Sequence, residues 1–304
     1  MRLGFLTVGL AMLVAACGTG EVEKKTAPTV ATPSAKPAGP AKPAPDARRL
    51  DSGPVPENES EIARTFERAF VAMPGQGGGQ TLATRMGAEP LADYLRAAGA
   101  VKFPTVLYLH GCAGLNGLTP LRAMARRGFA VVAPDSFARR FRPRQCDPVS
   151  RTGGRNVYVF DFRAAEISYA LHRFRRLPWI DKRRLFMVGV SEGGLAVAQY
   201  RGDEFRARVI TEWTCNGSPL VRGLAAAPDE PVLAVVRADD PWYTRVRGRG
   251  QRGDCGAFFG PRPRSRSIVI KKGRRHDVFK DKQAIGAILD FLSEESRRSA
   301  YRGS

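Results

Sequence analysis

The fold is decided by residues 185–199, LFMVGVSEGGLAVAQ, an apolar run that breaks at a serine between glycines and resumes as a helix-like stretch. The apolar residues before the serine predict a buried strand, and those from Glu192 onward predict a helix. Gly189 and Gly193 remove side chains that would clash in a tight strand–turn–helix connection, and such a turn exposes a serine hydroxyl. We therefore predict that Ser191 is a nucleophile on a sharp elbow; a turn that merely contains a serine is the alternative.

On both sides of this elbow, short apolar runs alternate with segments of helical periodicity. The predicted strands cover residues 105–109, 129–135, 184–190, 206–213, 231–238 and 267–272, and the predicted helices cover 59–73, 120–128, 159–177, 192–202 and 282–298. Continuously apolar strands separated by helices indicate an α/β fold, with a mostly parallel central sheet and helices on both faces. Active sites of such folds lie beyond the carboxyl ends of the strands.

A serine needs a base to remove its proton, and the chain has three histidines. His172 lies inside the predicted helix 159–177, and His110 begins the turn HGCAG after the strand 105–109, where we expect it to form hydrogen bonds within the loop. His276 follows the strand 267–272 and completes the chain order Ser–Asp–His that α/β-hydrolase sheets use. His276 is therefore the predicted base, against the alternative of a surface loop histidine.

The acid and the oxyanion donors are also predicted at strand ends. Asp239 directly follows the strand 231–238 and is the preferred acid, while Asp240, which could instead cap the next segment, stays open as the alternative. The tetrahedral oxyanion needs two N–H donors, which we assign to the backbone of Glu192, after the nucleophile, and of Cys112, in the turn HGCAG.

The first residues resemble a bacterial lipoprotein signal. Residues 1–16 combine Arg2, an apolar stretch and small residues before Cys17, which predicts a signal peptide and lipidation of Cys17. Residues 17–56, rich in Pro, Ala and Lys, predict an extended tether, and residues 57–304 have the length of one α/β domain. The expected location is the bacterial cell envelope, periplasmic or outer-membrane, with the membrane contacted through the lipid. The residue after Cys17 is Gly18 and not an aspartate, which favours the outer membrane.

The net charge of +20 suits anionic envelope polymers or lipid headgroups as partners, and we expect no nucleic acid partner because the chain carries an export signal. The Arg-rich stretches 136–145 and 243–253 are interpreted first as solvated loops and second as an anionic contact surface. Four cysteines remain beside Cys17, and an oxidising compartment favours two disulfides, most simply Cys112–Cys146 and Cys215–Cys255, although three pairings are open. No Cys/His cluster has metal spacing, so no metal and no cofactor are expected.

Taken in order, VLYLHGCAG, VVAPDSF, GVSEGG, RADDPWY and HDVF resemble the dienelactone hydrolase family of the α/β-hydrolase superfamily, especially its exported members. The resemblance covers about residues 100–290 and implies that Ser191, Asp239 and His276 are nucleophile, acid and base. It also implies that Cys112, Cys215 and Cys255 occupy positions used by exported relatives. Two departures stand out: this chain has serine where dienelactone hydrolases have cysteine, and RADD lacks the glycine that commonly precedes the acid.

These patterns predict an envelope-anchored serine hydrolase that cleaves a small-molecule carboxylic ester through an acyl-enzyme on Ser191. The alternatives are an acyltransferase or a peptidase on the same scaffold, and a catalytically silent binding module. Trp242, Tyr243 and Phe279 are expected to flank the site, which suits an apolar or aromatic acyl group, whereas the Arg-rich loops would favour an anionic substrate.

Overall fold

The computed structural model describes residues 60–298, apart from residues 144, 155, 157, 218–220 and 245–251. The predicted signal peptide, Cys17 and the tether lie outside the described residues. Among the helices within them, none is both long and apolar enough to cross a membrane.

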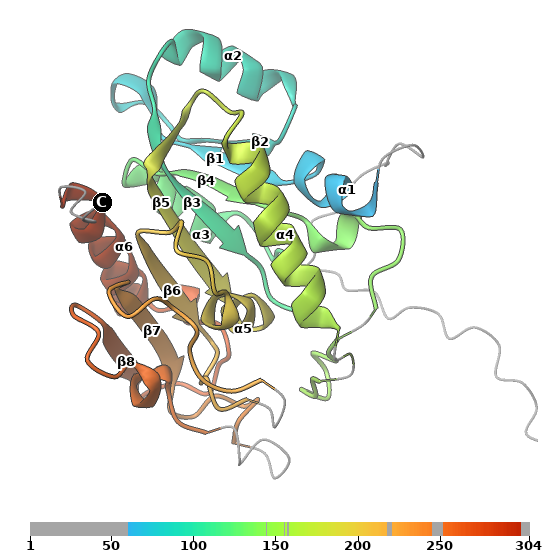
Figure 1. Cartoon of the computed structure of the whole chain (residues 1–304), viewed down its shortest axis with the longest axis vertical. Helices are drawn as coiled ribbons and strands as arrows, with labels where there is room; N and C mark the ends of the chain where they lie inside the picture. The colour runs from blue at the N-terminus through green and yellow to red at the C-terminus, as the bar shows by residue number, and fades with distance from the viewer. Residues whose placement is uncertain are drawn as a thin grey trace, which may run out of the picture. The chain divides into compact units, whose positions relative to one another are not determined.

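An eight-stranded sheet forms the centre of the domain (Figure 1). Its strands are β1 (Phe70–Met73), β2 (Leu82–Arg85), β3 (Phe103–Leu109), β4 (Ala130–Ala133), β5 (Ile180–Val190), β6 (Ala207–Thr211), β7 (Val232–Arg237) and β8 (Arg266–Ile270). Their order across the sheet is β2-β1-β4-β3-β5-β6-β7-β8. β1 runs antiparallel to β2 and β4, and all other neighbours are parallel, which confirms the predicted mostly parallel sheet.

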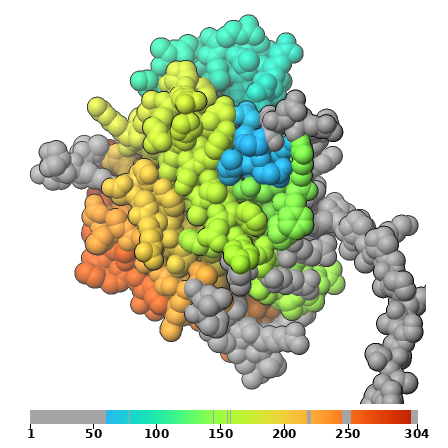
Figure 2. All heavy atoms as spheres, turned by 45° about the vertical axis from the view of Figure 1, so that its right-hand side comes forward, coloured from blue at the N-terminus to red at the C-terminus, as the bar shows by residue number. Residues whose placement is uncertain are grey.

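Helices cover both faces of the sheet (Figure 1). They are α1 (Glu61–Glu67), α2 (Glu89–Ala98), α3 (Thr119–Arg126), α4 (Val159–Phe174), α5 (Glu192–Gln199) and α6 (Lys282–Arg297). Helix α1 packs beside α4, as Figures 1 and 2 show. Helix α5 lies on the same face, and α3 and α6 pack on the opposite face (Figure 1). Strand β3 serves both layers, because Leu107 joins the core under α4 and α5 while Val106 joins the core under α3 and α6.

Two parts of the N-terminal region differ from the prediction. The predicted helix 59–73 ends at Glu67, and Phe70–Met73 form β1 instead, because this continuously apolar run is buried between β2 and β4. Strand β2 and helix α2 were not predicted. The other predicted strands and helices are present, with shifted ends; the helix expected to reach Gly202 stops at Gln199.

The parallel strands place their carboxyl ends along one edge of the sheet. His110 follows β3, Ser191 follows β5, Glu212 follows β6, Asp240 lies three residues beyond β7, and His276 lies six residues beyond β8. Five polar residues that are far apart in the chain therefore gather at the edge where α/β sheets carry their sites.

Candidate active site

Ser191 occupies a strained turn between β5 and α5. Its φ of 55° and ψ of −110° lie in a region that non-glycine residues rarely adopt, and its N–H donates to the carbonyl oxygen of Thr211 at 2.9 Å. A Cβ at Gly189 would lie 2.2 Å from the carbonyl oxygen of Gly193, and a Cβ at Gly193 would lie 2.0 Å from that of Leu109. Both glycines are thus required by the close approach of backbone, and the strained serine has the geometry of a nucleophile elbow.

His276 pairs with Asp240, and Asp239 does not take this position. Nδ1 of His276 lies 2.7 Å from Oδ2 of Asp240, which is 1% exposed, while Oδ1 of Asp240 accepts the backbone N–H of Trp242 at 2.9 Å. Asp239 is exposed. The preference for Asp239 is therefore wrong in this structure, because the chain turns at Ala238 and Asp239 before Asp240 points back into the site.

Glu212 is a further polar group at the site, and it was not predicted from the sequence. It is 3% exposed, has φ 59°, and places Oε2 at 3.5 Å from Nε2 of His276. Its Oε1 accepts the backbone N–H of Val278 at 2.8 Å. Nε2 of His276 is itself buried and makes no hydrogen bond to the described residues. The available signal was positional: Glu212 directly follows β6, as Ser191 directly follows β5.

The two carboxylates change the proton affinity of the imidazole. Burial alone would lower the pKa of His276, but Glu212 and Asp240 outweigh it and raise that pKa above the ordinary histidine value. Burial raises the pKa of Glu212 to about 7, against the opposing effects of His276 and of the Val278 N–H. The site therefore favours the protonated form of His276 more than water does.

The turn after β3 lies close to the elbow that carries Ser191. A Cβ at Gly111 would be in van der Waals contact with the Cβ of Ser191, at 3.5 Å, so about one side-chain atom separates this turn from the elbow. His110 is buried; its Nδ1 lies 2.8 Å from the carbonyl oxygen of Gly111, and its Nε2 accepts the backbone N–H of Ser136 at 3.1 Å. These two bonds fix a neutral imidazole that orders the loop, as the sequence analysis expected of His110.

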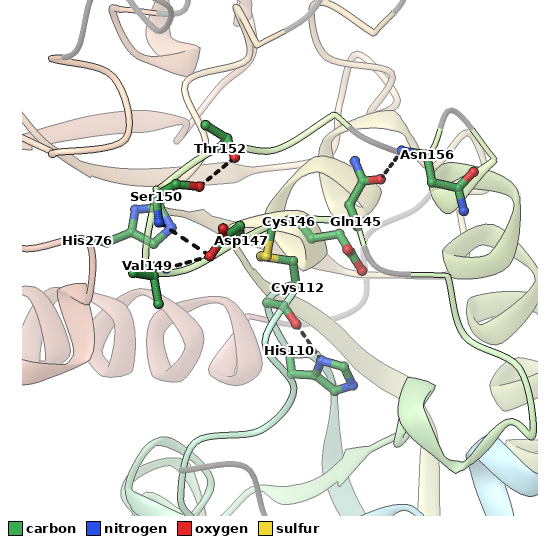
Figure 3. Close-up of a disulfide and its surroundings, with 12 residues drawn as sticks. His110, Cys112, Gln145, Cys146, Asp147, Val149, Ser150, Thr152, Asn156 and His276 are labelled. Carbon is green, nitrogen blue, oxygen red and sulfur yellow. Dashed lines mark hydrogen bonds between the residues drawn. A yellow bond between two sulfur atoms is a disulfide. The ribbon is translucent and has the colours of Figure 1, made fainter. Parts of the chain in front are cut away.

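Both expected disulfides are present. Cys112–Cys146 closes a sequence separation of 34 residues, and Cys215–Cys255 closes one of 40. The first joins the turn after β3 to the segment between β4 and α4, and Figure 3 shows it between the loop of His110 and the segment that carries Asp147. The predicted oxyanion donor, the N–H of Cys112, thus belongs to a cross-linked loop; its role and that of the Glu192 N–H stay predictions.

Buried arginines lie behind the elbow, where the sequence analysis expected a solvated loop. Arg142 donates to Oε1 of Glu192 at 2.5 Å. Glu166 accepts from two arginines, with Arg163 donating to its Oε2 at 2.9 Å and Arg139 donating to its Oε1 at 3.3 Å. The side chains of these three arginines and two glutamates are each 6% exposed or less. The solvated interpretation is wrong for Arg139 and Arg142, which are engaged with buried glutamates; residues 245–251 of the second Arg-rich stretch lie outside the described residues.

Of the three aromatic residues expected at the site, only Trp242 has a partly exposed side chain. Its ring centroid lies 5.3 Å from that of His276. Tyr243 is buried with its hydroxyl donating to the carbonyl oxygen of Glu212, and Phe279 is buried edge-on against Tyr108. Across the described residues, no group of three or more His, Cys, Asp or Glu side chains could hold a metal ion.

No protein-family model and no curated protein sequence matches the chain. Solved structures with a similar fold include a Klebsiella pneumoniae protein described as a dienelactone hydrolase, at 15% identity and a TM-score of 0.45, covering 74% of this chain and 99% of the other. Est1E from Butyrivibrio proteoclasticus has 15% identity and a TM-score of 0.45, with 76% and 94% covered. A hyperthermophilic esterase from Pyrobaculum calidifontis has 15% identity and a TM-score of 0.44, with 78% and 90% covered. At this distance the function of the chain rests on its own residues.

Proposed function

We propose that this protein is a serine hydrolase that cleaves carboxylic esters through an acyl-enzyme on Ser191, with His276 as base and Asp240 as the acid that orients it. The observation that carries the proposal is the 2.7 Å contact between His276 Nδ1 and buried Asp240, at the same sheet edge as a serine with φ 55°. A buried carboxylate on Nδ1 leaves Nε2 to accept a proton from a nucleophile. The order of the three residues along the chain is that of α/β-hydrolases.

In the proposed reaction, Ser191 Oγ attacks the ester carbonyl carbon while its proton moves to Nε2 of His276. The carbonyl electron pair moves onto oxygen, where the backbone N–H groups of Glu192 and Cys112 are the proposed donors. Collapse of this intermediate expels the alcohol, which takes the proton from His276. Water then attacks the acyl-enzyme by the same steps and frees Ser191. The scheme needs no cofactor.

Within the superfamily we place the chain near the exported dienelactone hydrolases, without their substrate. A serine nucleophile serves esters in general, and Trp242 beside His276 offers an apolar surface to an acyl or aromatic group. The buried ion pairs of Arg139 and Arg142 remove two of the cations that had favoured an anionic substrate.

A panel of chromogenic esters with graded acyl chains, each with a neutral and an acidic leaving group, tests this proposal. We expect hydrolysis by the wild type, its loss in Ser191→Ala, and a preference for apolar acyl groups that Trp242→Ala weakens. Undiminished hydrolysis by Ser191→Ala would refute the assignment. Acyl transfer to an added alcohol or amine in place of water would favour the transferase alternative, and inactivity on every ester would favour the peptidase or the binding module.

We further propose that the domain is anchored in the bacterial envelope through lipid on Cys17. Support comes from the signal-like residues 1–16 and from the two disulfides, which persist in oxidising compartments. Cells fed an alkyne fatty acid should yield labelled protein in the membrane fraction. The label and the membrane association should both disappear in Cys17→Ser; labelling that survives this change would place the lipid elsewhere.

A further inference from the structure

We propose that Glu212 is a positioning residue of this reaction, which holds the His276 ring from its Nε2 side and stabilises the protonated imidazole that forms when Ser191 loses its proton. This inference rests on the proposed function. Its basis is geometric: Glu212 Oε2 lies 3.5 Å from Nε2, while Asp240 Oδ2 lies 2.7 Å from Nδ1, so two buried carboxylates flank one imidazole.

The sheet places Glu212 beside the nucleophile. Strands β5 and β6 end in register, with Val190 opposite Thr211, and Ser191 N donates to Thr211 O. The next residues, Ser191 and Glu212, therefore leave the sheet side by side, about 5 Å apart as neighbouring strands are. Glu212 thus contacts His276 from the strand next to the one that leads into Ser191.

Several contacts hold Glu212 in this place. Its N–H donates to the carbonyl oxygen of Val235 at 3.0 Å, its carbonyl oxygen accepts the hydroxyl of Tyr243 at 2.8 Å, and Oε1 accepts Val278 N–H. The positive φ of 59° is a strained conformation for glutamate, and such strain is maintained where the surrounding contacts require it. The side chain therefore has one oxygen committed to the loop after His276 and the other directed at the imidazole.

Glu212 does not replace Asp240 as the acid. The acid must bind Nδ1 so that Nε2 can face the nucleophile, and Glu212 is on the Nε2 side at the longer distance. In the transfer, the Ser191 proton moves to Nε2 and its electron pair forms the bond to the carbonyl carbon. Glu212 takes up no proton in this step; its negative charge favours the imidazolium.

The remaining titratable groups around the pair are Asp277 and the buried phenols of Tyr108 and Tyr243. The phenols stay neutral, since burial raises the pKa of each well above the ordinary tyrosine value. Asp277 is half-exposed and pairs with Lys280 at 3.3 Å. Once ionised, at pH above about 7, Glu212 is thus the buried anion beside Nε2 whose removal changes the titration of His276.

The test variant is Glu212→Gln, which keeps an oxygen for the Val278 N–H and removes the charge. The matched control is Glu295→Gln, which removes a buried carboxylate of α6 that pairs at 3.1 Å with Arg264, two residues before the amino end of β8 and so opposite the carboxyl ends that carry the site. Two readouts are taken on the full chain across pH 5–9: the labelling rate of Ser191 by a fluorophosphonate, and the imidazole pKa values from NMR of histidine-labelled protein. With three histidines, loss of a signal in His276→Asn assigns His276.

We expect Glu212→Gln to shift the acid limb of the labelling profile, and the NMR pKa of His276, to lower pH by about one unit or more. Glu295→Gln should leave both at the wild-type values. A uniform loss of labelling with unchanged midpoints would show a purely structural role and overturn the proposal. If Glu212→Gln does not fold, the wild-type titration decides, because a His276 pKa below the ordinary histidine value would also overturn it. Absence of labelling in the wild type at every pH would instead refute the proposed function.

Discussion

Replacing Asp240 with asparagine tests the assignment of the acid, and the structure gives the size of the effect. Oδ1 of Asp240 accepts the N–H of Trp242 and Oδ2 faces Nδ1 of His276. An amide that keeps its oxygen on the Trp242 N–H must turn its NH₂ to Nδ1. The imidazole proton then moves to Nε2, where it blocks the acceptance of the Ser191 proton.

Loss of the charge-assisted bond between Asp240 and His276 costs about 1.5–3 kcal/mol. The amide then either leaves the Trp242 N–H unpaired or forces the wrong imidazole tautomer, and either outcome costs about 1–3 kcal/mol more. Together, at 1.36 kcal/mol per factor of ten, Asp240→Asn should slow the reaction of Ser191 by about 10²- to 10⁴-fold. The second-order rate constant for fluorophosphonate labelling at pH 8 measures this. Asp239→Asn, a change at the exposed neighbour, should stay within about twofold of the wild type. A large loss in Asp239→Asn with near-normal labelling of Asp240→Asn would refute the assignment.

Three further predictions concern stability. Gly193→Ala should prevent folding of the elbow or destabilise the domain by several kcal/mol, because its Cβ would lie 2.0 Å from Leu109 O; an unchanged thermal midpoint would contradict this. Replacing Cys112 and Cys146 together by serine should cost about 3–4 kcal/mol for the 34-residue separation, measured by urea unfolding against the unreduced wild type. Burial raises the pKa of Glu212 from 4.5 to about 7, so the free energy of unfolding of the wild type should fall as pH rises from 4.5 to 7. The free energy of unfolding of Glu212→Gln should equal that of the wild type at pH 4 and exceed it by about 3 kcal/mol at pH 8.

The pattern of apolar runs was sufficient to predict the parallel part of the sheet and the elbow, because the central strands β3, β4, β6 and β7 are mostly buried and largely apolar. It failed at Phe70–Met73, where Phe66, Phe70 and Met73 share a helical spacing while the run itself is long enough for a strand. The spacing of residues cannot tell that this segment lies between two other strands. The position of β1 beside β4 depends on contacts that are remote in the sequence.

The places of two candidate site residues in the fold were predicted, but the arrangement of the carboxylates was not. Ser191 and His276 were located by the strand ends, but the choice between Asp239 and Asp240 depends on how the turn after β7 directs each side chain. Glu212 was passed over as part of a strand, since its role depends on a histidine 64 positions later. Arg142 was interpreted as exposed from the local density of charge, whereas its partner Glu192 lies 50 positions away.

The central claim is that Ser191 is an activated nucleophile, and mapping a covalent adduct tests it most directly. The purified full-length protein would be treated with a fluorophosphonate, digested and analysed by mass spectrometry, with Ser191→Ala in parallel. We predict one phosphonate on the peptide that contains Ser191 in the wild type and none in the variant. An unmodified Ser191 peptide, or the same adduct in Ser191→Ala, would contradict the account.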